Sequence, residues 1–263
     1  MSKSKEIISG FLVSTIATTA VSCHRPKPQP DFYIPESLKK ISQPRPKYIK
    51  EFAPNPNRIA ITFDDGYDYE NVEKVLDLCQ GFDIQCTFFI VGTVLENNPV
   101  LWRKAMATYG CQICNHTYSH EYFDSLSNQQ IIDEIKKWEK IANEVFGSDY
   151  TANMKKYYPY LRVPGFIGSD DKRVQKVINQ LGYKIIGCDV ETMEEINKHN
   201  YQNEGKKNVD KKLSDYMVNT VKAQDIILFH FNDYDVNEQL GHTIFKLKQK
   251  NLEPVILSEY FQK

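Results

Sequence analysis

Two carboxylates stand side by side at the end of an apolar stretch of the chain. Asp64 and Asp65 follow the segment 58–63 and precede Gly66. The apolar segment predicts a buried strand, and polar residues just beyond such a strand lie at the carboxyl edge of a sheet, where α/β active sites form. A cation would relieve the repulsion between the carboxylates, so that one could bind it while the other acts as a base. The same residues also occur in plain turns, and that alternative stays open for this pair alone.

Two histidines provide the partners that such a cation would need. His116 and His120 are four residues apart and follow a second apolar segment, 111–114. On a helical turn, side chains at this spacing face the same way and can bind one metal. Together with one of the two carboxylates they supply two imidazoles and a carboxylate, the ligand set of a hydrolytic zinc site or of a non-haem metal site. Zinc is the first choice for the metal, and cobalt, nickel and manganese accept the same ligands.

From residue 58 onward, segments with strand-like and helix-like patterns alternate. The apolar and β-branched segments predict strands at 58–63, 85–91, 111–114, 160–163, 184–190, 225–231 and 253–257. The spacing of apolar residues predicts helices at 69–79, 99–109, 128–146, 171–181, 213–223 and 241–249. Ser127 is expected to cap the helix 128–146. This alternation predicts a parallel sheet or barrel with helices on the outside.

Four short segments carry a resemblance to a known family. They are Thr-Phe-Asp-Asp-Gly at 62–66, His-Thr-Tyr-Ser-His at 116–120, Arg-Val-Pro-Gly at 162–165 and Leu-Phe-His at 228–230. In order and spacing they resemble four of the five motifs of the polysaccharide deacetylases, which form carbohydrate esterase family 4 and share the NodB-homology domain. The resemblance extends from residue 57 to the C-terminus. It implies an α/β fold, a distorted (β/α) barrel with fewer than eight strands.

The resemblance also implies roles for individual residues. The metal ligands of the family match Asp65, His116 and His120, and its general base matches Asp64. An amine leaves an amide only when it is protonated, and the general acid of the family matches His230. One divalent metal is therefore the implied cofactor.

Three further residues match the surroundings of the reacting groups in the family. Arg162 resembles the residue that orients the base carboxylate. The backbone N–H of Gly165 falls where the family stabilises the oxyanion, and Leu228 resembles the apolar wall of the acetyl pocket.

The remaining family motif is altered in this chain. The family has Asp-x-x-Asp-Trp after a strand, whereas Glu191 and Glu194 stand here in the acidic places and Glu195 in the Trp place. A carboxylate near the general acid would raise the pKa of that histidine. Glu191 is the first candidate for this role and Asp189 the alternative. The missing Trp changes one wall of the expected substrate groove, so a different sugar preference is open.

The first 56 residues predict export. Two lysines precede an apolar run at 7–21, which predicts a signal peptide over 1–22. Small residues before Cys23 resemble a bacterial lipoprotein cleavage site, and a lipid on Cys23 would anchor the chain to the membrane. Simple secretion and an uncleaved anchor are the alternatives. The Pro- and Lys-rich segment 23–56 is expected to be a tether, and 57–263 the catalytic domain.

Composition excludes some partners and leaves the cysteines undecided. The 263 residues carry a net charge of -1, so no basic field attracts nucleic acid, and no obligate protein partner is implied. Five cysteines follow Cys23, and because five is an odd number they cannot all form disulfides with one another. Cys111 and Cys114 form a CxxC pair that suits a redox or zinc motif, but free core thiols are the favoured interpretation. A disulfide between Cys86 and Cys114 is left open.

The expected function is a metal-dependent deacetylase that hydrolyses N-acetyl groups of a cell-wall or exported polysaccharide. Peptidoglycan, chitin-like polymers and poly-N-acetylglucosamine are the substrates that the family resemblance and the export signal imply. Two alternatives stay open. One is a small-molecule amidohydrolase on the same barrel, and the other is a non-catalytic glycan-binding protein.

Overall fold

The computed structural model describes residues 56–198, 206–231 and 240–261. The expected signal peptide (1–22), Cys23 and the tether up to residue 55 lie outside the described residues. None of the helices within the described ranges is long and apolar enough to cross a membrane.

The centre of the described chain is a sheet in which every pair of neighbouring strands is parallel. Its strands are β1 (Arg58–Asp65), β2 (Thr87–Ile90), β3 (Gln112–Asn115), β4 (Tyr160–Leu161), β5 (Lys184–Ile185), β6 (Val190–Glu191), β7 (Ile226–His230) and β8 (Glu253–Val255). The strand order is β5-β4-β3-β2-β1-β7-β6, and β8 pairs with the first residues of β1. Among the described residues, seven strands follow one another in the curled sheet and β8 lies off this path. The expected α/β fold, a distorted barrel with fewer than eight strands, is confirmed.

Between β5 and β6 the chain leaves the sheet, so the predicted single strand 184–190 is wrong. The carbonyl groups of Ile186 and Gly187 accept hydrogen bonds from the Arg162 side chain, at 3.3 and 3.0 Å. Asp189 then pairs with Ile226 of β7 through its backbone N–H. The segment thus crosses from the β4 side of the sheet to the β7 side, because the guanidinium of Arg162 takes the acceptors that a neighbouring strand would use.

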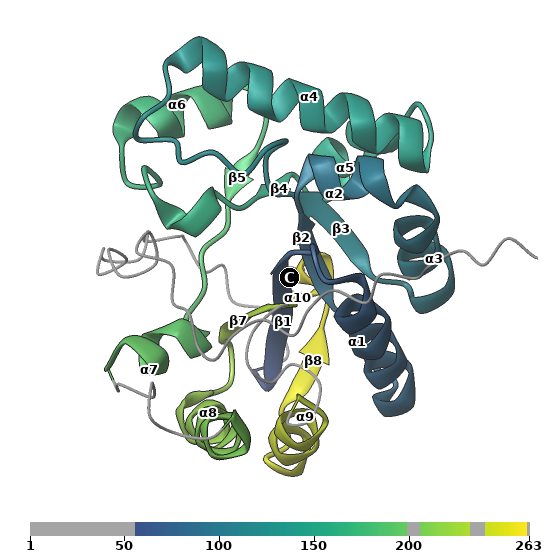
Figure 1. Ribbon diagram of the computed structural model, residues 1–263, viewed down its shortest axis with the longest axis vertical. Coiled ribbons are helices and arrows are strands. Elements are labelled where there is room, and N and C mark those ends of the chain that lie inside the picture. Colours follow the sequence, from purple (N-terminus) through teal and green to yellow (C-terminus); the bar gives the residue numbers. More distant parts are fainter. Residues whose placement is uncertain (1–55, 199–205, 232–239, 262–263) are drawn as a thin grey trace, which may run out of the picture. The chain divides into compact units, whose positions relative to one another are not determined.

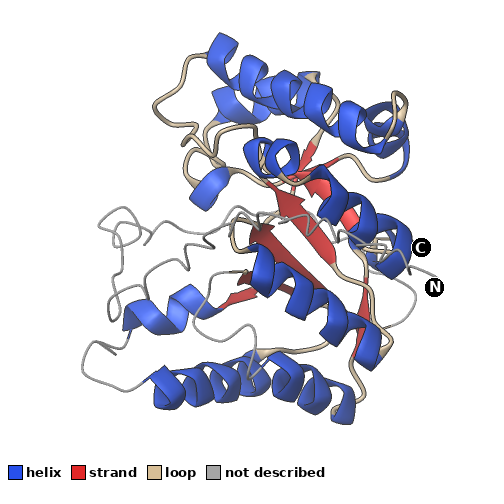
Figure 2. Ribbon diagram, turned by 45° about the vertical axis from the view of Figure 1, so that its right-hand side comes forward, coloured by secondary structure: helices blue, strands red, loops and turns tan. Residues whose placement is uncertain are grey.

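Helices cover the outer face of the sheet, as Figure 2 shows with strands in red and helices in blue. The helices of the described residues are α1 (Tyr69–Phe82), α2 (Gly92–Asn97), α3 (Pro99–Tyr109), α4 (Asn128–Phe146), α5 (Tyr150–Tyr157), α6 (Lys172–Gln180), α7 (Thr192–Lys198), α8 (Lys206–Thr220), α9 (Leu240–Gln249) and α10 (Leu257–Tyr260). Leu257 and Tyr260 of α10 instead pack against the inner face of the sheet. Helix α4 lies beside α6, and α8 lies beside α9 (Figure 1). Ser127 caps α4 as predicted, in a reciprocal capping box with Gln130.

The two faces of β1 belong to different apolar clusters. Ile59, Ile61 and Phe63 are fully buried in the larger cluster beneath the helices. Ala60 points the other way, into a smaller cluster inside the curl of the sheet. Because side chains alternate along a strand, Asp64 shares this inner face. The strand therefore directs a carboxylate into the sheet interior, where it must find a partner.

All five cysteines of the described residues are buried free thiols, which confirms the core-thiol interpretation. The Sγ atoms of Cys79 and Cys86 are 3.2 Å apart. Burial raises the pKa of Cys111 and Cys114, so their thiols stay protonated at neutral pH. Cys86 and Cys114, for which the sequence left a disulfide open, are both free and form no disulfide with each other.

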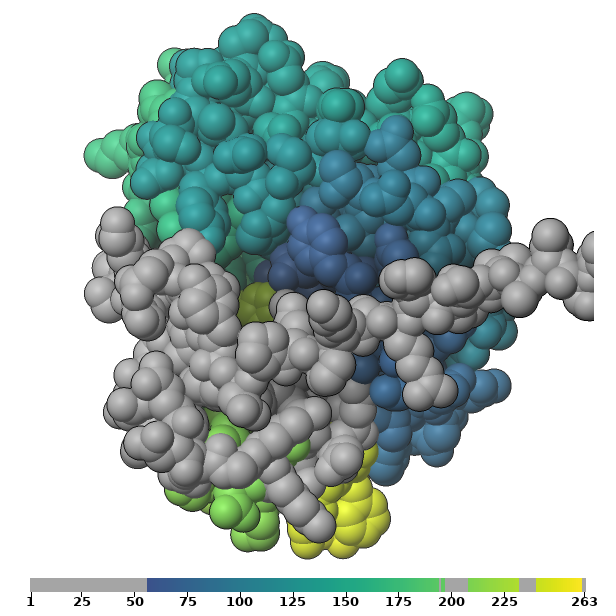
Figure 3. All heavy atoms as spheres, viewed as in Figure 1, coloured from purple at the N-terminus to yellow at the C-terminus, as the bar shows by residue number. Residues whose placement is uncertain are grey.

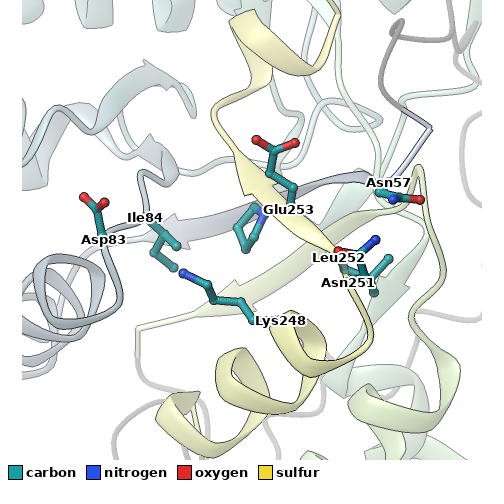
Figure 4. A pocket seen from close by; sticks show the side chains of 8 residues that line it. Asn57, Asp83, Ile84, Lys248, Asn251, Leu252 and Glu253 are labelled. Carbon is teal, nitrogen blue, oxygen red and sulfur yellow. The ribbon is translucent and has the colours of Figure 1, made fainter.

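A surface pocket of about 450 Å³ lies at the amino-terminal edge of the sheet, where Asn57 precedes β1 and Glu253 begins β8. Figure 4 shows Lys248 and the other side chains that line it. The candidate site residues follow the opposite ends of the strands, so this pocket is separate from them.

Candidate metal and catalytic site

The candidate residues meet at the carboxyl edge of the sheet because the strand register aligns the ends of β1, β2, β3 and β7. Asp64 is level with His230, and Asp65 is level with Ile90. Ile90 is in turn level with Asn115, which directly precedes His116. Residues from distant parts of the sequence are thus brought to one edge, as their positions at strand ends predicted.

Asp65, His116 and His120 form a cluster that fits a metal ion. One ligand atom from each residue lies within 4.8 Å of the others. Oδ1 of Asp65 is 3.4 Å from Nε2 of His116 and 3.2 Å from Nε2 of His120. That oxygen is buried and has no hydrogen-bond partner among the described residues. A buried carboxylate oxygen with no donor, faced by two imidazole nitrogens, is the arrangement that a bound divalent metal would complete.

The orientation of His116 is fixed on its far side. Its ring is buried, and Nδ1 lies 2.9 Å from the carbonyl oxygen of Arg162, to which an Nδ1–H can donate. This hydrogen bond leaves the lone pair on Nε2, the nitrogen that faces Asp65. A ligand histidine commonly donates its other ring N–H in this way.

The electrostatics of Asp65 favour the ionised form that a metal ligand needs. Burial by itself would raise the pKa of Asp65, but His116 and His120 beside it, with His230 nearby, hold the pKa well below its usual range. The backbone of Asp65 is left-handed, with φ 75°, which breaks the side-chain alternation of β1 at its last residue. Gly66 continues the turn at φ 94°, and a Cβ there would lie 2.8 Å from the Trp102 ring.

A loop, rather than the predicted helical turn, brings the two histidines together. Thr117 and His120 both have left-handed backbones, with φ 67° and 66°, and neither value fits a helix. The N–H of Thr117 donates to the Asn115 side chain at 2.8 Å, and the N–H of His120 donates to Thr117 Oγ1 at 3.2 Å. The two histidines therefore lie together as predicted, but a loop and not a helical turn positions them.

Asp64 and Arg162 form a buried ion pair beside this cluster. Nη1 of Arg162 donates to Oδ1 of Asp64 at 2.7 Å and to Thr62 Oγ1 at 2.9 Å. The guanidinium also lies over the Phe89 ring, 4.2 Å from its centroid. The second carboxylate oxygen of Asp64, Oδ2, is 3.7 Å from Nε2 of His116. Arg162 thus holds one oxygen of Asp64 and leaves the other facing the cluster.

His230 ends β7 and is half-buried. Glu191 is level with Leu228, two residues before His230. Oδ2 of Asp189 instead accepts the backbone N–H of Ile226 at 2.8 Å, near the start of β7. A strand rises about 3.3 Å per residue, so Ile226 is about 13 Å from His230 along β7. Of the two candidate carboxylates, Glu191 has the nearer backbone position. The side chain of Glu194 lies outside the described residues.

Gly165 and Leu228 occupy different surroundings. Leu228 is buried in the inner apolar cluster. Gly165 lies in a short 3-10 turn, Pro164–Phe166, with a left-handed φ of 55°. A Cβ on Gly165 would lie 3.1 Å from Cε1 of Tyr122.

Two residues near the cluster were not predicted from the sequence. The ring of Tyr122 lies 6.2 Å from that of His120, between centroids. Glu134 of α4 accepts hydrogen bonds from the 116–120 loop. Neither residue belongs to a recognisable sequence motif, although Glu134 lies at a polar position of a strongly amphipathic helix and could have been noted there.

Tyr67, just beyond β1, is 52% exposed, and Figure 3 shows dark blue atoms of this part of the chain at the surface.

The sequence is similar to those of known proteins. Residues 52–186, about half of the chain, match the family profile described as polysaccharide deacetylase. Over 231 residues the chain is 28% identical to the peptidoglycan-N-acetylglucosamine deacetylase PgdA of Listeria monocytogenes. That match covers 87% of this chain and 42% of the Listeria protein, so the chain spans less than half the length of this relative.

Solved structures share the fold. The chitin deacetylase of the fungal pathogen Colletotrichum lindemuthianum superimposes with a TM-score of 0.65 at 23% identity, covering 80% of this chain and 89% of that one. A CE4 family pseudoenzyme from Bacillus anthracis gives 0.64 at 20% identity, covering 80% and 66%. At such identities the likeness concerns the fold alone. The profile match and the fold together show that the chain belongs to the polysaccharide deacetylase family.

Proposed function

We propose that this chain is a metal-dependent deacetylase that hydrolyses N-acetyl groups of a cell-wall or exported glycan, with peptidoglycan as the first candidate. The observation that carries the proposal is the convergence of Asp65, His116 and His120 beside the Arg162-bound carboxylate of Asp64. A metal-ligand cluster next to a positioned base is what amide hydrolysis requires. The Listeria relative supports peptidoglycan as the substrate class.

The metal would be held by Asp65 and by the Nε2 atoms of His116 and His120. Zinc is the first choice, and cobalt, nickel or manganese suit the same ligands. When bound, such an ion would lower the pKa of water and polarise the substrate carbonyl.

The remaining residues of the site handle protons and position groups. Asp64 takes the proton of the attacking water through Oδ2, while Arg162 holds Oδ1 and thereby fixes the direction of the carboxylate. His230, at the end of β7, protonates the leaving amine, and the charge of Glu191 keeps this imidazole protonated.

Two groups complete the acetyl site. The backbone N–H of Gly165, in the turn Pro164–Phe166, stabilises the oxyanion. Support comes from Tyr122, which a Cβ on Gly165 would contact and whose ring neighbours that of His120. Leu228 packs against the acetyl methyl group from inside the sheet.

Export with a lipid on Cys23 is part of the proposal, because a cell-wall substrate lies outside the cytoplasm. The PgdA relative supports a cell-wall location. Metabolic labelling with radioactive palmitate, in wild type and Cys23→Ser, tests the anchor. Label on wild type and none on the variant is the expected result, and no label on either would leave simple secretion or an uncleaved anchor.

Acetate release from a panel of glycans tests the function. Metal-loaded protein is incubated with peptidoglycan, chitin oligomers and poly-N-acetylglucosamine, and with small cyclic amides as the competing substrate class. Release from at least one glycan is expected, at a rate that falls at least about 100-fold after Asp64→Asn. Turnover of the amides alone would point to a small-molecule amidohydrolase, and glycan binding without turnover of any substrate would point to a non-catalytic binding protein.

A further inference from the structure

The 116–120 loop, which carries both histidines, is held by a carboxylate of helix α4. Glu134 Oε2 accepts the backbone N–H of Tyr118 at 3.0 Å and that of Ser119 at 2.8 Å. Its other oxygen, Oε1, accepts the hydroxyl of Ser119 at 2.8 Å. Three donors from two adjacent loop residues therefore converge on one side chain. A carboxylate is well suited to this task because it has acceptor sites on both oxygens.

The backbone carbonyl groups of the same loop are held by α2. The backbone N–H of Gly92 donates to the carbonyl of Thr117 at 2.9 Å, and that of Thr93 donates to the carbonyl of Tyr118 at 3.0 Å. Packing here is close, since a Cβ on Gly92 would lie 2.9 Å from Cα of Tyr118. The loop is thus held on two sides: its carbonyl groups accept hydrogen bonds from α2, and its N–H groups donate hydrogen bonds to Glu134. We call these two sets of hydrogen bonds the clamp.

The two histidines depend on this clamp to different degrees. His116 is buried, and its Nδ1 is bonded to the Arg162 carbonyl, so its ring has a support of its own. The side chain of His120 is 27% exposed, and its backbone is left-handed. A left-handed backbone is unfavourable for a residue with a Cβ and persists only where neighbours hold it. The position of His120 therefore depends on the loop that Glu134 holds.

We propose that Glu134 is a positioning residue for the metal site. By accepting hydrogen bonds from the N–H groups of Tyr118 and Ser119, it holds Nε2 of His120 close enough to Oδ1 of Asp65 for both atoms to bind one metal ion. It acts through the backbone and does not touch the metal. This inference rests on the proposed metal site. It predicts that the affinity for the metal, rather than folding as such, suffers most when the carboxylate is removed.

Calorimetric titration of metal-depleted protein with Zn²⁺ tests the inference. Glu134→Ala is expected to weaken zinc binding about 10–100-fold, the range found for residues that support metal ligands. Glu134→Gln is expected to stay within about threefold of wild type, because its amide oxygen can accept both N–H groups while its NH₂ donates to Ser119 Oγ. Glu144→Gln is the matched control, since Glu144 is an exposed residue of the same helix.

The outcomes separate positioning from general stability. Thermal unfolding of the metal-free variants is measured alongside, and Glu134→Asp, whose shorter side chain cannot reach both N–H groups, replaces Glu134→Ala if the latter does not fold. Zinc affinity of Glu134→Ala or Glu134→Asp within about threefold of wild type, with a lowered melting temperature, would show a structural role only and overturn the inference. If wild type itself binds no zinc, the proposed metal site is wrong and this inference falls with it.

Discussion

Arg162 Nη1 lies 2.7 Å from Asp64 Oδ1, and both side chains are buried in the interior of the curled sheet. The same guanidinium bonds the carbonyl groups of Ile186 and Gly187, where the chain leaves the sheet between β5 and β6. One side chain thus neutralises the inward-facing carboxylate and also binds the segment that connects β5 to β6. The fold and the site depend on the same contact.

Asp64→Asn should separate metal binding from turnover. The amide cannot take a proton from water, so kcat for acetate release should fall about 10²–10⁴-fold, the usual contribution of a general base. Zinc affinity should change little, because the three ligands remain. Acetate assays and zinc titration on the same preparation measure both quantities. A rate close to wild type would show that Asp64 is not the base.

Arg162→Met should destabilise the fold as well as abolish activity. It leaves the Asp64 carboxylate buried without its cation, which typically costs about 3–5 kcal/mol of unfolding free energy. Urea unfolding followed by circular dichroism measures the loss. Arg103→Met is the control, because Arg103 is exposed and bonds the Val145 carbonyl at 3.3 Å. A similar small loss in both variants would contradict the importance given to the buried pair.

Two glycines should respond oppositely to alanine. Gly81 lies in α1, and a Cβ added there would meet no atom within 4 Å, so Gly81→Ala should stabilise the protein by up to about 1 kcal/mol through helix propensity. Gly92→Ala must displace the backbone of Tyr118, and overpacking of this kind costs about 1–3 kcal/mol. Zinc affinity should fall in Gly92→Ala alone. Equal affinities in the two variants would show that the loop tolerates the shift.

Stability should fall in alkaline solution because of buried tyrosines. Burial raises the pKa of Tyr150 well above its ordinary value, and its hydroxyl donates to the Ile113 carbonyl at 2.6 Å. Above about pH 10 the unfolded chain releases this proton while the folded chain keeps it, so the unfolding free energy falls as pH rises. Below that pH both states hold the proton and Tyr150 contributes no pH dependence.

Urea unfolding at pH 9, 10 and 11 measures this effect. Between pH 10 and 11, Tyr150→Phe should lose about 1 kcal/mol less than wild type, since one pH unit of one group corresponds to about 1.36 kcal/mol. Tyr157→Phe, at a tyrosine that is 63% exposed, should follow the wild-type curve. Identical curves for all three proteins would contradict the assignment to Tyr150.

The sequence predicted the elements whose signals are local. Helices α3 and α4 have the expected bounds because Asn98 and Ser127 cap their first turns and their apolar positions keep a helical spacing. The parallel sheet followed from the alternation of elements. The short helices α2 and α5 were not predicted, since six and eight residues carry too little periodicity to recognise.

The failures have long-range causes. The strand predicted at 184–190 is divided because Arg162, more than twenty residues earlier, takes its carbonyl groups. The helical turn predicted for His116 and His120 is a loop because Glu134 and α2 stabilise a left-handed backbone there. Residue types identified the candidate ligands, but the contacts that position them come from distant segments that no local pattern reveals.

The most direct test of the central claim is to add Zn²⁺ stepwise to metal-depleted protein while acetate release from peptidoglycan is measured. A metal site formed by Asp65, His116 and His120 predicts a rate that rises with added zinc up to one equivalent per chain and then stays constant. It also predicts no response from His116→Ala that has retained its fold by circular dichroism. A rate that is independent of zinc, or an equal response from His116→Ala, would contradict this site.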